Sequence, residues 1–134
     1  GRAGKSFRRV GADDGWLRFR ELEYALCKQF AALDHAVIGL GGGTVRYAWN
    51  RDVLRGSGVT VLLTARLETL AGRVRSHDRP RVHPGTTLEQ DLAAIWTQHR
   101  QLYLDAADVV YDTDQGKTVA QDVEDLLGLL EPWL

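Results

Sequence analysis

The sequence predicts an α/β fold in which a parallel sheet is flanked by helices. Short apolar runs alternate along the chain with longer segments of helical periodicity, which is typical of strands joined by helical crossovers. The first apolar run, residues 35–40, leads directly into Gly41, Gly42 and Gly43. Ligands of open α/β sheets bind beyond strand ends, and glycine lets the backbone approach them closely. These glycines therefore mark either a ligand site or a flexible loop.

Composition indicates one globular domain over residues 1–134. The chain is 44% hydrophobic and 26% charged, and its net charge is −1. This balance gives no general attraction to nucleic acid or to anionic membranes, so neither is expected as a partner. Cys27 is the only cysteine, and we expect it to be a packing residue. No run of residues has the apolar length of a membrane span or the pattern of a signal peptide, and we expect a cytoplasmic protein.

Residues 15–33 are predicted to form an amphipathic helix, because apolar side chains recur at spacings of three and four. These side chains are Phe19, Leu22, Leu26 and Phe30. Within the helix, Arg20 and Glu23 lie three positions apart and can meet on one face. The pair is either a guanidinium oriented for binding or a solvated surface ion pair.

The next elements are a short helix over residues 48–54, a buried strand over residues 59–64 and a helix over residues 67–74. A cationic, irregular segment follows, because prolines exclude a continuous helix. Its basic residues are Arg73, Arg75, His77, Arg79, Arg81 and His83. Such a loop can close over an anionic ligand or remain solvated. A nucleic-acid patch is disfavoured, because no aromatic side chains are interleaved.

Two capping boxes open the last two helices, one from Thr87 to Gln90 and one from Thr118 to Gln121. A third strand is expected between these helices, over residues 108–112. The first helix carries one stripe that is expected to face mostly inward: Leu88, Leu92, Ile95, Trp96, His99 and Tyr103. The closing helix is expected to direct four side chains inward: Val123, Leu126, Leu127 and Leu130.

Taken together, these residues resemble the shikimate kinases over essentially the whole chain. The family stretch G-x-S-I-x-x-I-F-x-x-x-G-E-x-x-F-R-x-x-E aligns without a gap from Gly4 to Glu23, with Trp16 in place of its glutamate. Gly4, Lys5 and Ser6, which look like the end of a P-loop, then belong to the loop before the helix. Further matches follow in the family order: Gly41-Gly42-Gly43, Asn50-Arg51, Leu54, Arg79-Pro80, Leu102-Tyr103, Ala107-Asp108 and Thr113.

The resemblance implies a P-loop kinase fold, similar to the nucleoside monophosphate kinases, with a lid at about residues 75–86. It also implies the activity: transfer of the γ-phosphoryl of ATP, with Mg²⁺, to the 3-hydroxyl of shikimate in chorismate biosynthesis. The expected partners are shikimate and ATP, and a complete protein is expected to be a monomer.

By resemblance, Arg20 would hold the shikimate carboxylate, and the backbone of Gly41, Gly42 and Gly43 would lie against the ring. A second arginine of the family, four residues before the tyrosine of the Leu-Tyr pair, is replaced here by His99. Arg100 is one residue later, and one helical step turns a side chain by about 100°. The C-terminal substrate contact is therefore assigned to Arg100 or His99.

For the nucleotide, the resemblance implies a catalytic role for Arg79, which would close over the transferred phosphoryl group. Arg79 would also contact ATP, and Arg73 would lie against the adenine. No residue of this chain is assigned to a metal. The family has a strand, a P-loop, a helix and an Asp-x-Asp strand before the part that this chain resembles, so we expect the 134 residues to be N-terminally incomplete and inactive alone.

Three hypotheses remain. The chain is part of a shikimate kinase, or a non-catalytic relative that binds shikimate or nucleotide without a P-loop, or an interaction domain. Upstream sequence encoding G-x-x-G-x-G-K-[ST] would favour the first over the second.

Overall fold

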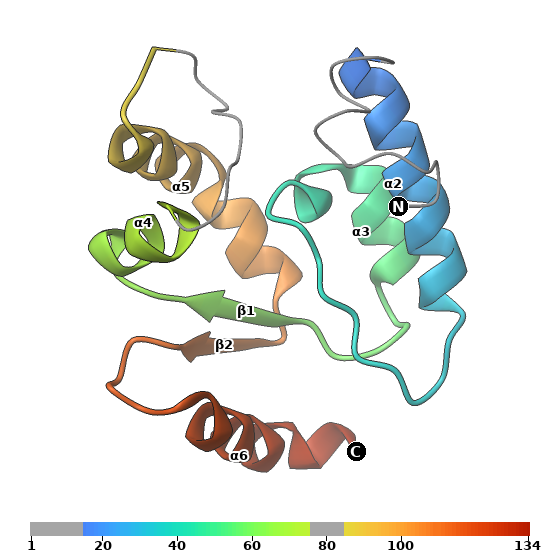
Figure 1. Cartoon of the computed structure of the whole chain (residues 1–134). Coiled ribbons are helices and arrows are strands. Elements are labelled where there is room, and N and C mark those ends of the chain that lie inside the picture. Colours follow the sequence, from blue (N-terminus) through green and yellow to red (C-terminus); the bar gives the residue numbers. More distant parts are fainter. Residues whose placement is uncertain (1–14, 76–84) are drawn as a thin grey trace. The chain divides into compact units, whose positions relative to one another are not determined.

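The computed structural model describes residues 15–75 and 85–134 (Figure 1). The chain divides after Gly58 into two compact units, and each is described by itself. Arg79 and most of the predicted lid lie outside the described residues, as do Gly4, Lys5 and Ser6.

The first unit is helical. Helix α2 (Gly15–Ala31) packs against helix α3 (Ala48–Leu54), and a single 3-10 turn, η1 (Thr44–Arg46), precedes α3 (Figure 1). Both predicted helices are confirmed, although α2 ends two residues earlier than expected. Cys27 is buried in α2, as predicted, and burial together with the charge of Glu23 raises the pKa of its thiol. Cys27 is therefore held as a neutral packing residue.

The predicted strand over residues 35–40 is wrong. This segment has no regular secondary structure, and the side chain of Val37 is fully exposed. A strand requires a hydrogen-bonded neighbour, and within residues 15–75 and 85–134 the only ladder joins two other segments. An apolar β-branched run indicates the capacity to pair, but it does not supply the partner.

The second unit has a two-stranded parallel sheet. Strands β1 (Val61–Thr64) and β2 (Val109–Asp112) pair in register from Val61 opposite Val109 to Thr64 opposite Asp112. Helices α4 (Leu67–Arg75) and α5 (Leu88–Ala106) cover one side of the sheet (Figure 1). Helix α6 (Val119–Leu130), followed by a 3-10 turn η2 (Glu131–Trp133), covers the other. The predicted parallel α/β arrangement is confirmed here.

Both predicted capping boxes are present. The hydroxyl of Thr87 accepts from the Gln90 amide at 3.2 Å, while the Gln90 side chain accepts from the Thr87 amide at 3.0 Å. Thr118 and Gln121 make the same reciprocal pair at the start of α6. These bonds satisfy backbone donors that a helix leaves unpaired at its first turn, which fixes where α5 and α6 begin.

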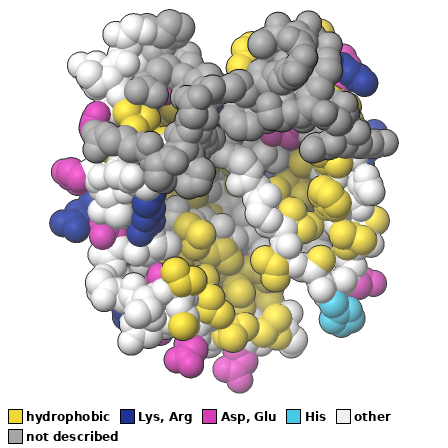
Figure 2. Space-filling view, viewed as in Figure 1, with side chains coloured by type: hydrophobic (Ala, Val, Ile, Leu, Met, Phe, Trp, Pro, Cys, Tyr) yellow, Lys and Arg dark blue, Asp and Glu magenta, His cyan; other side chains and the backbone are white. Residues whose placement is uncertain are grey.

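Burial in the second unit is less complete than the sequence predicts. Leu63 is 57% exposed and Val110 is 51% exposed, although both strands were expected to be buried. Trp96, Val123 and Leu127, expected to face inward, are also exposed. The physical reason is that two strands and three helices leave much of their apolar surface uncovered, and Figure 2 shows apolar side chains gathered at the surface. Among the described helices, none is long and apolar enough to cross a membrane.

Candidate substrate site

Arg20 and Glu23 form an ion pair within the first unit, and it is not a solvated surface pair. Nη1 of Arg20 donates to Oε1 of Glu23 at 2.9 Å, and the two side chains are only 18% and 15% exposed. Their spacing of one helical turn on α2 brings them together. Their low exposure excludes the solvated surface pair, and a binding role for the Arg20 guanidinium stays a prediction.

Glu23 also holds the turn that follows the glycines. Its Oε2 accepts from the Thr44 hydroxyl at 2.9 Å, and its Oε1 accepts from the Asn50 side chain at 3.2 Å. Asn50 is completely buried, and its amide also donates to the Thr44 carbonyl at 2.9 Å. One carboxylate therefore fixes Arg20 on α2, Thr44 on η1 and Asn50 on α3 relative to one another.

Two aromatic rings lie close to the Arg20 guanidinium. Its central carbon lies 4.9 Å from the centroid of the Phe19 ring and 4.8 Å from that of Tyr47. Tyr47 is stacked in turn on Trp49, with centroids 4.9 Å apart. A cation placed over ring faces is attracted by the ring quadrupole and loses rotational freedom. Arg20 is thus pre-organised before any ligand arrives, and this lowers the entropic cost of binding.

Gly43 is the glycine at which an added side chain would meet two guanidinium groups. A Cβ atom at this position would lie 2.8 Å from Nη2 of Arg20 and 2.8 Å from Nη2 of Arg46. The backbone of Gly43 has φ −87° and ψ −14°, which any residue can adopt, so the requirement is for space. A Cβ on Gly41 would make an ordinary contact, and one on Gly42 would meet nothing within 4 Å. The Arg20 guanidinium therefore lies next to the Gly43 backbone.

Replacing Gly43 with alanine is expected to displace both guanidinium groups, because real Cβ atoms do not approach within 3.0 Å of other heavy atoms. The groups are the ends of flexible side chains, so the unit should still fold. For shikimate, the ligand that the sequence resemblance implies, we expect the affinity to fall by about 10-fold while the thermal midpoint changes little. Calorimetric titration and thermal denaturation measure the two effects. Gly39→Ala is the matched control, because a Cβ at residue 39 would meet no described atom within 4 Å. Equal affinities for both variants would contradict the role given to Gly43.

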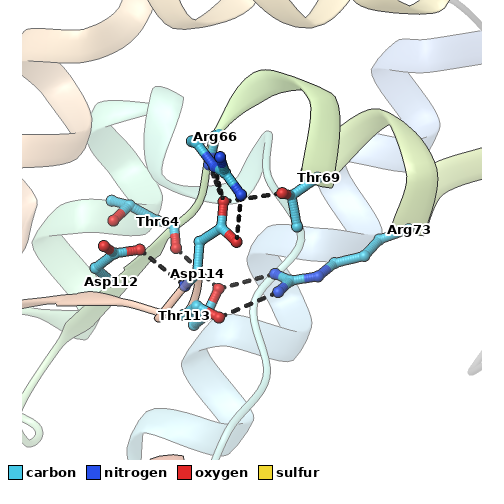
Figure 3. Close-up of polar contacts among 7 residues, drawn as sticks. All are labelled: Thr64, Arg66, Thr69, Arg73, Asp112, Thr113 and Asp114. Carbon is cyan, nitrogen blue, oxygen red and sulfur yellow. Dashed lines mark hydrogen bonds and ion pairs between the residues drawn. The ribbon is translucent and has the colours of Figure 1, made fainter. Parts of the chain in front are cut away.

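In the second unit, Arg73 is held by the residue that follows strand β2 (Figure 3). Its guanidinium donates to the Thr113 hydroxyl at 2.8 Å and to the Thr113 carbonyl at 3.2 Å. The Thr113 hydroxyl in turn donates to the Thr64 carbonyl at 2.8 Å, at the end of β1. Arg73 itself is exposed on α4. Because Thr113 follows β2 and binds the end of β1, these bonds hold the planar guanidinium at the carboxyl ends of both strands.

Asp114 closes the same end of the sheet. It accepts from the Arg66 backbone amide at 3.1 Å, from Nε of Arg66 at 2.7 Å and from the Thr69 hydroxyl at 2.8 Å (Figure 3). These hydrogen bonds, led by the one from the Arg66 side chain, lower the pKa of the Asp114 carboxyl far below its usual range. Asp114 thereby ties the chain after β2 to the start of α4.

Changing Asp114 to asparagine is expected to lower the thermal midpoint at neutral pH by about 4 °C. The lowered pKa means that the folded state holds the carboxylate in its charged form, so this contribution is present above the unfolded pKa of about 3.9. It is lost as the pH falls from there toward the folded pKa. Thermal denaturation of both proteins between neutral pH and pH ~2 should show their midpoints converging in acid. A constant difference would contradict the assignment.

Two other predicted site residues, His99 and Arg100, lie on α5, and their predicted contacts with the substrate stay predictions. His99 is half-buried on α5, and Arg100 is exposed on the same helix. Both belong to the second unit, whereas Arg20 and the three glycines belong to the first. Arg79 lies outside the described residues.

Sequence reasoning missed the residues that support Arg20. Thr44 and Asn50 reach Glu23 from positions 21 and 27 residues further along the chain. The Asn50-Arg51 pair was noted only as a family match, yet Asn50 binds the Thr44 carbonyl and Arg51 donates to the Val45 carbonyl at 2.8 Å. A polar Asn-Arg pair on a short helix after a glycine run was the available signal.

A family model that matches almost the entire chain identifies the family of this protein. The family model described as "SKI: Shikimate kinase" matches residues 1–130. The chain belongs to the shikimate kinase family. Among curated shikimate kinases, that of Nitratidesulfovibrio vulgaris is 34% identical over 132 residues, covering 96% of this chain and 74% of the relative. That of Pseudomonas aeruginosa is 38% identical over 125 residues, covering 89% and 70%.

Solved structures of shikimate kinases also resemble this chain. "Shikimate kinase from Acinetobacter baumannii in complex with shikimate" has a TM-score of 0.86 and 25% identity, and the match covers 99% of this chain and 74% of that one. The shikimate kinase of Bacteroides thetaiotaomicron matches with a TM-score of 0.83 at 24% identity, covering 97% and 77%, and it shows the fold. The P-loop kinase fold implied by the sequence is therefore confirmed.

Proposed function

We propose that this chain is the shikimate-binding part of a shikimate kinase, that it binds shikimate through Arg20 and Gly43, and that the reaction of the complete enzyme is the ATP-dependent phosphorylation of the shikimate 3-hydroxyl. The observation that carries the proposal is the Arg20 guanidinium, which is bonded to Glu23, lies close to two aromatic rings and is next to the backbone of Gly43. Family membership and the shikimate bound to the Acinetobacter baumannii relative support the choice of ligand.

Arg20 would bind and orient the substrate carboxylate. A guanidinium has five N–H donors in a planar fork, and Glu23 receives only one recorded bond from it. The remaining donors can therefore form a paired hydrogen bond with a second carboxylate. Fixing the carboxylate would fix the position of the ring, and that position determines where the reacting hydroxyl lies.

The backbone of the three consecutive glycines would contact one face of the shikimate ring. Among the described residues, no atom lies within 4 Å of the point where a Cβ on Gly42 would stand, so the space there is open to a ligand. Backbone amides of Gly41, Gly42 and Gly43 would then face the ring directly. Because Gly43 also contacts the Arg20 guanidinium, carboxylate and ring recognition would be adjacent.

For the nucleotide, Arg73 fits the role expected from the resemblance. Its guanidinium is pinned by two hydrogen bonds to Thr113, and a fixed planar cation can stack on a purine base. Arg79 would close over the transferred phosphoryl group and stabilise its charge, and the C-terminal substrate contact would come from Arg100 or His99.

Magnesium is not assigned to any residue of this chain. Within residues 15–75 and 85–134, no group of three or more histidine, cysteine or acidic side chains could hold a metal ion. ATP would supply the phosphoryl group and Mg²⁺ would neutralise its charge. Because these 134 residues contain no complete G-x-x-G-x-G-K-[ST] sequence, we expect this polypeptide alone to release no ADP.

The experiment is a calorimetric titration of the 134-residue chain with shikimate and with shikimate methyl ester, which lacks the anionic carboxylate. We expect saturable binding of shikimate and at least ~10-fold weaker binding of the ester, because charge-assisted hydrogen bonds are lost. Absence of saturable binding, or equal affinity for the two compounds, would overturn the proposal.

A further inference from the structure

Arg46 places a second guanidinium beside Arg20. Nη2 of Arg46 and Nη2 of Arg20 each lie 2.8 Å from the point where a Gly43 Cβ would stand. The two nitrogens are therefore separated by no more than twice that distance. Arg46 is the last residue of η1, and its backbone amide donates to the Gly43 carbonyl at 3.2 Å, so the side chain starts close to the glycine.

The charges at this point do not balance. Glu23 forms an ion pair with Arg20, and its two oxygens already accept from Arg20, Asn50 and Thr44. Within the part of the chain that the structure describes, Arg46 forms no ion pair. Two guanidinium groups and one carboxylate leave a positive charge at Gly43, and neighbouring like charges repel until an anion joins them.

Two buried polar atoms at this site have no hydrogen-bond partner among the described residues. They are Nε of Arg46 and Oδ1 of Asn50. Asn50 is completely buried, so its orphaned oxygen has lost water without gaining a donor. Unsatisfied groups of this kind are rare in folded proteins and mark places where a partner is absent. An orphaned N–H donor calls for an acceptor, and an orphaned amide oxygen calls for a hydroxyl or amine donor.

We infer that Arg46 is a second binding residue for the substrate carboxylate. The guanidinium groups of Arg20 and Arg46 would both bind this carboxylate next to Gly43. This inference rests on the proposed function and extends it, because the sequence and the family resemblance gave Arg46 no role. The ligand chemistry that satisfies the charge at Gly43 is a carboxylate. This carboxylate neutralises the excess charge and accepts from Arg46.

The shared position at Gly43 explains why two arginines can serve one carboxylate. A side chain on residue 43 would occupy the space next to both guanidinium groups. Arg20 is fixed by Glu23 and the rings, whereas Arg46 has no acidic partner among the described residues to compete with a ligand. Arg46 therefore contributes binding that depends on the charge of the ligand.

The test compares Arg46→Gln with Arg55→Gln, which removes the same charge from an exposed residue at the end of α3. Affinities for shikimate and for its methyl ester are measured by calorimetry on the 134-residue chain. Arg46→Gln should weaken shikimate binding by about 10-fold and leave the ester unchanged, because one charge-assisted contact is lost. Arg55→Gln should change neither affinity. Arg46→Lys keeps the charge without the fork and should recover part of the loss.

Each outcome decides the inference. If Arg46→Gln weakens both ligands equally, Arg46 is only structural, and if it weakens neither, Arg46 does not touch the carboxylate. In either case the proposed function stands, provided that the unmodified chain prefers shikimate to the ester. If the unmodified chain shows no such preference, the proposed function fails and this inference fails with it.

Discussion

Replacing Arg20 with glutamine is expected to weaken shikimate binding by about 100-fold, because two charge-assisted hydrogen bonds of about 1.5 kcal/mol each are lost. Glutamine keeps a polar side chain of similar reach but has neither the charge nor the paired donors. The loss should appear for shikimate in a calorimetric titration and be much smaller for the methyl ester.

Arg55→Gln is the matched control for Arg20→Gln, since it removes an exposed charge of the same unit. Circular dichroism of both variants should show that α2 remains folded, because Arg20 contributes one ion pair to a helix of 17 residues. An Arg20→Gln protein that binds shikimate as well as the unmodified chain would show that the carboxylate is held elsewhere.

Replacing Glu23 with alanine is expected to have the largest effect on stability in the first unit. Three donors on three elements lose their acceptor, and those of Arg20, Thr44 and Asn50 are partly or fully buried. We expect the free energy of unfolding to fall by about 3 kcal/mol, because each orphaned buried donor costs on the order of 1 kcal/mol or more. Urea denaturation followed by circular dichroism measures this loss.

Glu21→Ala provides the comparison for Glu23→Ala. Glu21 lies on the same helix, is exposed and bonds only to Arg18 at 3.3 Å among the recorded contacts, so its removal should cost less than about 0.5 kcal/mol. Shikimate affinity should also fall in Glu23→Ala, because Arg20 is no longer held in place. If the two variants were equally stable, Glu23 would not be the centre of the network that the structure shows.

The sequence predicts local features of this fold well. The capping boxes at Thr87 and Thr118 depend on residues three positions apart, and both are present in the structure. The meeting of Arg20 with Glu23 likewise depends on one helical turn, and it is confirmed at 2.9 Å. Such interactions are determined by spacing along the chain, so periodicity is sufficient to find them.

Features that depend on distant partners could not be predicted. Residues 35–40 have the composition of a strand but no ladder among the described residues, and Leu63 lies in a strand yet is exposed. The bonds from Thr44 and Asn50 to Glu23, and from Arg73 to Thr113, join residues between 21 and 40 positions apart. Spacing does not encode these contacts, because they depend on how helices and turns pack.

The most direct test of this account is a crystal structure of the chain with shikimate bound. We expect the shikimate carboxylate to accept hydrogen bonds from the Arg20 guanidinium while Glu23 keeps its own bond to Arg20, with the ring lying against Gly42 and Gly43. Shikimate bound at another surface, with its carboxylate beyond hydrogen-bonding distance of Arg20, would contradict the account.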